Sequence, residues 1–197
     1  MVEIFINYRT ADEPYGAALL DDHLSAVFGD DVVFRAAKSI RPGDDFADRM
    51  LRAVRGATVL LAVIGPNWLV ELNKRDPAGD WVRREISEAF AHGVRVIPVL
   101  MNVPRLVPGD LPADIVELAE CQDVRVHFRD TASALPAFVA RLCELIPDLS
   151  PKPVEEVKRS PFVQAENVGS VFNGNVEIAG SFTSFVNDSR RNTGSER

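Results

Sequence analysis

The sequence predicts an α/β fold in which helices flank a five-stranded parallel sheet, followed by a flexible linker and a short β-prone tail. Two observations support this. From residue 2 to about residue 149, short apolar runs alternate with amphipathic stretches, which is typical of βα units. The run at 58–64 is apolar without alternation, as expected of a strand covered by helices on both faces. We therefore expect that strand to be central.

Five strands are expected, at residues 2–7, 32–34, 58–64, 94–100 and 124–128. Between them, apolar residues recur at helical spacing and give one core-facing stripe per helix. The stripes contain Leu20, Leu24, Val27 and Phe28; Phe46, Met50 and Val54; Val82, Ile86, Ala89 and Phe90; and Leu135, Phe138, Leu142 and Ile146. We expect Asp44 or Asp45 to cap the second helix, and Asp80 to cap the third. Residues 65–79 are interpreted as a loop.

The charge balance argues against two classes of partner. Lys and Arg number 22 against 29 Asp and Glu, a formal net charge of −7, so we expect no binding to nucleic acid or to an anionic membrane surface. The longest apolar run, residues 59–64, is far shorter than the roughly 20 residues that span a bilayer. Glu3 stands where a secretory signal would carry a basic residue. A cytoplasmic protein is expected.

The potential metal ligands show no metal-binding spacing. The two cysteines form no CxxC pair, and the three histidines are scattered. These residues are Cys121, Cys143, His23, His92 and His127. We expect free thiols, a reducing compartment and no bound metal.

The composition changes after residue 147 and divides the chain into four parts. Prolines and charged residues make 148–160 a linker, and 188–197 is expected to be a disordered terminus. The segment 161–187 contains no Lys or Arg, and its even positions from 168 to 186 are mostly apolar or small, an alternation that favours strand. Three interpretations stay open for it: a disordered end, a surface hairpin, or a self-assembling cross-β segment.

Four ordered segments resemble the TIR (Toll/interleukin-1 receptor) family over residues 1–147. They are Ile-Phe-Ile-Asn-Tyr-Arg at 4–9, Val33-Phe34 leading into Ser-Ile-Arg-Pro-Gly at 39–43, Gly-Pro-Asn-Trp at 65–68, and Asp-Trp-Val-Arg-Arg-Glu-Ile at 80–86. The resemblance implies a flavodoxin-like fold in which residues 35–43 form the BB loop of the family.

TIR domains include adaptor scaffolds and enzymes that cleave NAD, and the resemblance favours the enzymes. The enzymatic branch, which includes bacterial defence proteins, carries a glutamate soon after a tryptophan on the third helix. Glu85 matches that glutamate as the catalytic residue. The resemblance further implies that NAD contacts Tyr8, Arg9, Phe34, Lys38, Ser39 and Trp81. Asn7 replaces the usual Ser, and Ala36 stands where many relatives have Asp.

The spacing of Trp81 and Glu85 also suggests a site, because positions i and i+4 share one helix face. Residues 65–79 follow the central strand, and open α/β sheets bind ligands at the carboxyl ends of their strands. The alternatives are ordinary ones. Glu85 would be a solvated acid on the helix surface, Trp81 the edge of the core, and Arg9 a surface ion pair with Asp12 or Glu13.

One carboxylate suits this chemistry. A glycosidase needs a second acid to protonate its leaving group, whereas the nicotinamide of NAD⁺ is cationic and leaves as a neutral amine. An ionised Glu85 near the ribose would stabilise the oxocarbenium-like transition state. NAD⁺ is then the substrate, and no cofactor is expected. The product is ADP-ribose or a cyclic isomer, since both arise from the same cation.

The expected function is therefore an NAD⁺ glycohydrolase switched on by self-assembly in immune or stress signalling. Its partners would be other TIR domains, contacted through the BB loop. The tail resembles short amyloid signalling motifs, which implies a sensor protein that shares this motif. The alternatives are a scaffold without catalysis and a signalling protein whose active part is the tail.

Overall fold

The computed structural model describes residues 3–36, 46–127, 129–147 and 149–152. Five parallel strands form one sheet in the order β2-β1-β3-β4-β5. Their bounds are Ile4–Asn7 (β1), Val33–Arg35 (β2), Val59–Ile64 (β3), Arg95–Met101 (β4) and Val124–Val126 (β5). This is the flavodoxin-like strand order, and β3 is central, so both predictions are confirmed.

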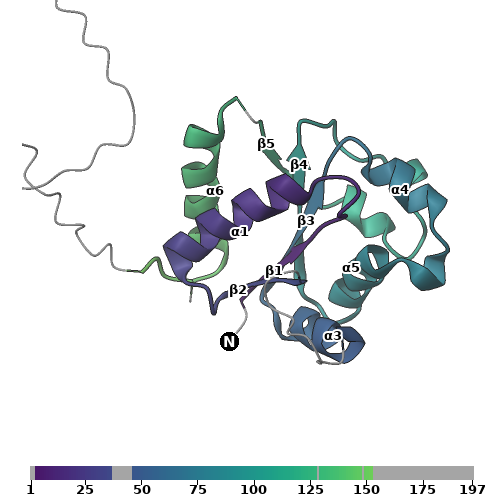
Figure 1. The fold of residues 1–197 in the computed structure, drawn as a ribbon, viewed down its shortest axis with the longest axis horizontal. Helices are drawn as coiled ribbons and strands as arrows, with labels where there is room; N and C mark the ends of the chain where they lie inside the picture. Colours follow the sequence, from purple (N-terminus) through teal and green to yellow (C-terminus); the bar gives the residue numbers. More distant parts are fainter. Residues whose placement is uncertain (1–2, 37–45, 128, 148, 153–197) are drawn as a thin grey trace, which may run out of the picture. The chain divides into compact units, whose positions relative to one another are not determined.

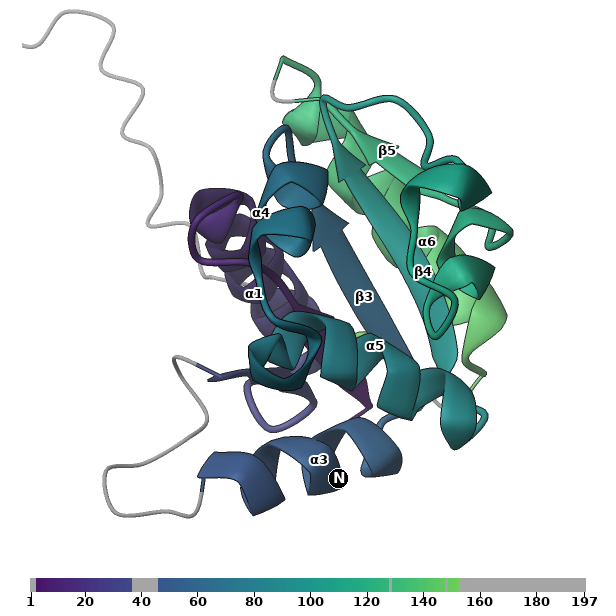
Figure 2. The same cartoon turned by 90° about the vertical axis from the view of Figure 1, so that its right-hand side faces the viewer.

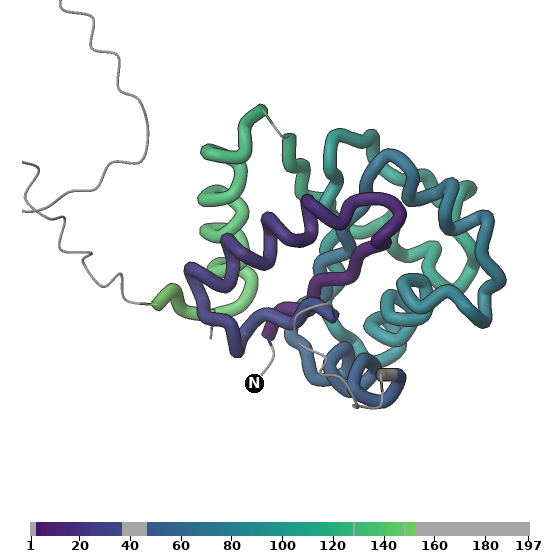
Figure 3. The backbone as a smooth tube through the Cα atoms, in the orientation of Figure 1, coloured from purple at the N-terminus to yellow at the C-terminus, as the bar shows by residue number. Residues whose placement is uncertain are grey.

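Helices cover both faces of the sheet (Figure 1). Helices α1 (Pro14–Phe28) and α6 (Thr131–Leu145) lie side by side on one face, as the backbone trace also shows (Figure 3). Helices α3 (Phe46–Gly56), α4 (Trp68–Lys74) and α5 (Trp81–Ala91) lie on the other face, which Figure 2 turns toward the viewer. Each βα crossover therefore adds a helix to one of the two faces.

Strand β3 explains why there are two cores. Its side chains alternate between the faces, so Val59, Leu61 and Val63 pack with α1 and α6. Leu60, Ala62 and Ile64 pack with α3, α4 and α5. All six are at most 1% exposed. Burying each large aliphatic side chain contributes about 1.5–3 kcal/mol to the free energy of unfolding, so β3 stabilises both cores of the domain.

The interpretation of residues 65–79 as a loop was wrong. This segment contains α4 and a 3₁₀ turn at Pro77–Gly79. Trp68 and Leu72 are one helical turn apart, and both are buried in the core beneath α4. A helix of seven residues has too few turns to show a clear period in the sequence.

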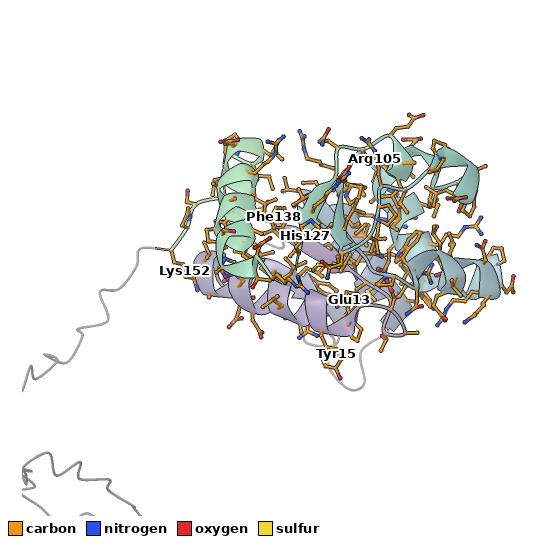
Figure 4. All side chains as sticks on the ribbon, turned by 90° about the horizontal axis from the view of Figure 1, so that it is seen from above. Glu13, Tyr15, Arg105, His127, Phe138 and Lys152 are labelled. Carbon is orange, nitrogen blue, oxygen red and sulfur yellow. The ribbon has the colours of Figure 1, made fainter. Side chains whose placement is uncertain are left out.

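The domain extends past the predicted boundary at residue 147. Leu149 is 4% exposed within the core between α1 and α6. The backbone N–H of Lys152 donates to the carbonyl of Val27, at 2.7 Å, next to the last turn of α1 (Figure 4). Asp44, Asp45 and the segments 161–187 and 188–197 lie outside the described residues. No helix in the described part of the chain is long and apolar enough to cross a membrane.

Candidate active site

A cleft of about 470 Å³ lies at the carboxyl end of β1. Strand order reverses between β1 and β3, because the chain leaves β1 to one side and returns on the other, and ligand crevices form at such points. The cleft was expected beside residues 65–79, but that segment contributes only Arg75 and Gly79. The full lining is Phe5, Ile6, Tyr8, Arg9, Thr10, Ala36, Met50, Arg75, Gly79, Asp80, Trp81, Val82 and Glu85.

Glu85 lies in this cleft and is buried, with 4% of its surface exposed. Asn7 Nδ2 donates to Glu85 Oε2 at 2.7 Å and also lies 3.1 Å from the carbonyl oxygen of Val82. Asn7 thus joins the end of β1 to the first turns of α5. The alternative of a solvated glutamate on the helix surface is wrong, because α5 packs on one face of the sheet, against β1, β3 and β4, and this side chain reaches Asn7 of β1.

The burial of Glu85 changes its protonation. Loss of hydration raises the pKa of its carboxyl from the ordinary 4.5 to about 8, and the nearby Asp80 also raises it. The hydrogen bond from Asn7 and the charge of Arg9 act in the opposite direction. At neutral pH the carboxyl of the ligand-free protein is therefore mainly protonated.

Arg9 forms a buried ion pair with Asp80. Its Nη1 and Nη2 atoms donate to the two carboxylate oxygens at 2.9 and 2.6 Å, and both side chains are 2% exposed. The guanidinium also lies over the ring of Trp68, 5.1 Å from the centroid. A surface pair of Arg9 with Asp12 or Glu13 is therefore wrong. Arg9 still lines the cleft, although Asp80 neutralises its charge.

Asp80 has a second role at the start of α5. Its Oδ1 accepts a hydrogen bond from the backbone N–H of Arg83 at 3.2 Å, so the predicted N-cap is confirmed. The same carboxylate therefore caps the helix that carries Glu85 and binds the residue that follows β1 by two positions. Sequence reasoning found the cap but missed the pairing with Arg9.

The other residues predicted to contact NAD lie in different environments. Tyr8 and Trp81 line the cleft, and the guanidinium of Arg84 lies 4.9 Å from the centre of the Trp81 ring. Phe34 is not part of the lining, because it stacks on Phe5 in the core with the ring centroids 5.1 Å apart. Lys38, Ser39 and most of the BB loop lie outside the described residues.

Sequence reasoning noted Asn7 only as a departure from the family. Its position was a usable signal, because Asn7 is a polar residue at the carboxyl end of an otherwise apolar strand, where ligand sites form. Among the residues that the structure describes, no group of three or more His, Cys, Asp or Glu side chains could hold a metal ion. Cys121 and Cys143 are both free thiols.

The raised pKa of Glu85 predicts a pH-dependent loss of stability. Below pH 4.5 both the folded and unfolded states are protonated, whereas between 4.5 and about 8 only the unfolded state releases the proton, so stability falls as pH rises. Glu85→Gln retains an acceptor for Asn7 and cannot ionise. Its melting temperature should increasingly exceed that of the wild type from about pH 5 to about pH 9. Parallel melting curves across this range would refute the buried, protonated carboxyl.

The buried ion pair predicts a large difference between two aspartates. Asp80→Ala leaves the guanidinium of Arg9 buried without its partner, which should cost about 3–5 kcal/mol of unfolding free energy. The matched control is Asp114→Ala, which removes the partly exposed pair with Arg83 and should cost about 1 kcal/mol or less. Urea unfolding measures both values. Equal losses would mean that the Arg9–Asp80 pair does not hold the site together.

Comparisons with known proteins agree with this architecture. A family model described as "TIR domain" matches residues 4–139. The TIR domains of the activated Roq1 resistosome, a structure that directly recognises the pathogen effector XopQ, superpose with a TM-score of 0.56 at 12% identity. The alignment covers 72% of this chain and 99% of that chain. At this identity the likeness concerns the fold.

Two further solved structures match less closely. The TIR domain of the Toll-related receptor TRR-2 from Hydra magnipapillata gives a TM-score of 0.49 at 17% identity, covering 75% of this chain and 100% of that one. A TIR-STING receptor from C. gigas, in complex with 2′,3′-cGAMP, gives 0.47 at 20% identity, covering 68% of this chain and 38% of that one. Because the family model spans more than half of its length, the chain belongs to the TIR domain family.

Proposed function

We propose that this protein is an NAD⁺ nucleosidase that breaks the bond between nicotinamide and ribose, and that self-assembly activates it. The observation that supports this most directly is the buried carboxyl of Glu85, held by Asn7 inside the cleft. A buried acid without an ion-pair partner is costly for a fold. Such groups concentrate at functional sites, where the cost is retained for their chemistry.

The proposed reaction needs one carboxylate and water. The bond between C1′ of the ribose and the ring nitrogen breaks, and its electron pair neutralises the positive charge of the nicotinamide. Water then attacks the oxocarbenium-like carbon and loses a proton, giving ADP-ribose. A cyclic isomer forms when a nitrogen of the adenine attacks instead. An ionised Glu85 stabilises the developing cation at the ribose.

Substrate binding would supply the ionised form of Glu85. The nicotinamide ring of NAD⁺ carries a positive charge, and a positive charge close to a buried carboxyl lowers its pKa. The proton is then released as the substrate enters. In the free protein, the pKa of about 8 keeps the carboxyl neutral and so limits the cost of burying it. The same burial would strengthen its electrostatic effect on the transition state.

Nicotinamide release measures the proposed activity. Glu85→Gln should reduce NAD⁺ cleavage by about a hundredfold or more, because it removes the carboxylate proposed to stabilise the cation that develops at the ribose. The control is Glu88→Gln on the same helix, which changes a carboxylate that binds Arg55 at the surface, 2.5 Å away. This control should keep wild-type turnover.

The pH profile gives a second readout. In the wild type, kcat/KM should rise with pH through about 8, because that parameter reports the free enzyme, in which Glu85 must lose its proton. If Glu85→Gln cleaves NAD⁺ at the wild-type rate, the catalytic assignment is wrong. If the wild type releases no nicotinamide at high protein concentration, the protein is better described as a TIR scaffold.

Assembly is the second part of the proposal, and it rests on the sequence. The BB loop at 35–43 and the tail at 161–187 lie almost entirely outside the described residues. Stacked tails would hold many TIR domains at about millimolar effective concentration and so favour weak contacts between them. A sensor protein with a similar segment would seed the stack. We propose that this assembly serves immune or stress signalling in the cytoplasm.

Specific activity should therefore increase with protein concentration, and deletion of residues 161–187 should lower it. Pro42→Asp in the BB loop should reduce activity without removing a catalytic group.

A 161–187 peptide should form fibrils with a strand spacing of about 4.8 Å. Ile178→Pro should prevent these fibrils, because proline removes a backbone hydrogen-bond donor. A constant specific activity over about a hundredfold dilution, with a peptide that stays monomeric, would exclude activation by assembly.

A further inference from the structure

At the starts of α1 and α5, a backbone N–H group is already bound by a carboxylate of the chain itself. Phosphate groups commonly bind at helix N-termini, where free N–H groups and the helix dipole favour negative charge. At the start of α1, Glu13 accepts a hydrogen bond from the N–H of Gly16 at 3.0 Å. At the start of α5, Asp80 accepts one from Arg83. Both helix ends therefore carry a carboxylate of the chain itself.

The loop that leads into α4 is filled in the same way. The two carboxylate oxygens of Asp12 accept hydrogen bonds from the N–H groups of Gly65 and Asn67, both at 2.7 Å. A Cβ atom on Gly65 would lie 2.7 Å from the nearer oxygen, so the glycine allows this close approach. A phosphate here would have to displace Asp12 and would meet its negative charge. Because these described donors are taken, a cationic side chain is the favoured partner for a phosphate in the described part of the cleft.

Two of the described residues that line the cleft carry a positive charge, Arg9 and Arg75. Asp80 neutralises Arg9 through two hydrogen bonds. Arg75 is exposed, ends α4 as its C-cap, and forms no ion pair with any described residue. The acid one turn earlier, Glu71, is bound by Lys74 at 2.9 Å. Arg75 therefore supplies the uncompensated positive charge within the described lining.

We propose that Arg75 forms a phosphate subsite of the cleft, which makes the protein selective for nicotinamide nucleotides over nicotinamide riboside. In this arrangement the ribose that bears nicotinamide lies at Glu85, and the diphosphate of the dinucleotide lies at Arg75. A guanidinium suits this role, because its planar donors bind two phosphate oxygens at once. This inference rests on the proposed NAD⁺ cleavage and adds the group that the site recognises.

Three substrates separate phosphate recognition from catalysis. NAD⁺ carries a diphosphate, nicotinamide mononucleotide carries one phosphate, and nicotinamide riboside carries none. With the full chain, Arg75→Ala should lower kcat/KM for NAD⁺ about tenfold, mainly through KM, since a hydrogen bond to a charged group is lost. Arg75→Lys should restore part of the loss, and Arg75→Glu should deepen it. Cleavage of the riboside should change less than about twofold, because it has no phosphate to lose.

The matched control is Arg95→Ala, which removes an exposed arginine from the amino end of β4, whereas the cleft lies at the carboxyl end of β1. It should leave all three substrates unchanged. Equal losses for NAD⁺ and riboside in Arg75→Ala would mean that Arg75 only supports the fold of the cleft. Unchanged kinetics for NAD⁺ would overturn the subsite while leaving the catalytic proposal intact.

Binding of ADP-ribose tests the subsite without turnover. Calorimetric titration of ADP-ribose into the wild type and Arg75→Glu should show weaker binding to the variant, together with a weaker dependence on salt. A protein that binds ADP-ribose through Arg75 but cleaves no NAD⁺ would overturn the proposed function and retain the subsite. Equal ADP-ribose affinity in the two proteins would refute the subsite whatever the activity.

Discussion

The arrangement of the cleft depends on the buried pair between Arg9 and Asp80. Arg9 follows the carboxyl end of β1, and Asp80 is the N-cap of α5. Two hydrogen bonds between them therefore connect the end of this strand to the helix that carries Glu85. Neither charge is exposed to water, and each would be costly to bury alone. Each side chain can therefore stay buried only while it is paired with the other. Asn7 adds a second link between the same two elements.

These two links have different electrostatic consequences. Arg9 and Asp80 cancel each other, which leaves the floor of the cleft nearly neutral. Among the described residues Glu85 forms no ion pair, and its carboxyl accepts a hydrogen bond from the amide of Asn7. Burial then governs its protonation and raises the pKa of the carboxyl to about 8. In the proposed function this neutral acid becomes charged beside a cationic substrate, and its neutral form limits the cost of burying it without ligand.

The distribution of charge around the cleft also bears on what it can bind. Carboxylates of the chain take up the N–H groups at the starts of α1 and α5 and in the loop before α4. This arrangement strengthens the fold, because each carboxylate satisfies donors that would otherwise lack partners. The same hydrogen bonds make these backbone N–H groups unavailable to ligands. The proposed phosphate recognition therefore rests on Arg75, an exposed side chain among the described residues that line the cleft.

The local pattern of the sequence determined the fold class. The continuous apolar run of β3 and the helical stripes of α1, α5 and α6 depend on residues close together in the chain, so their periods are visible without a structure. The ordered motifs likewise pointed to Glu85 and Trp81, both of which line the cleft. The short helix α4 was not predicted, because two helical turns show too little periodicity in the sequence.

Only the tertiary structure decided how Glu85 is held and charged. Its partner Asn7 lies 78 residues away in the sequence, and Arg9 and Asp80 are 71 residues apart. No local pattern encodes such pairs, because the register of the parallel strands and the packing of α5 bring them together. The same packing buries a glutamate that would be solvated on an isolated helix. Its residue type was a property of the sequence, whereas its raised pKa is a property of the fold.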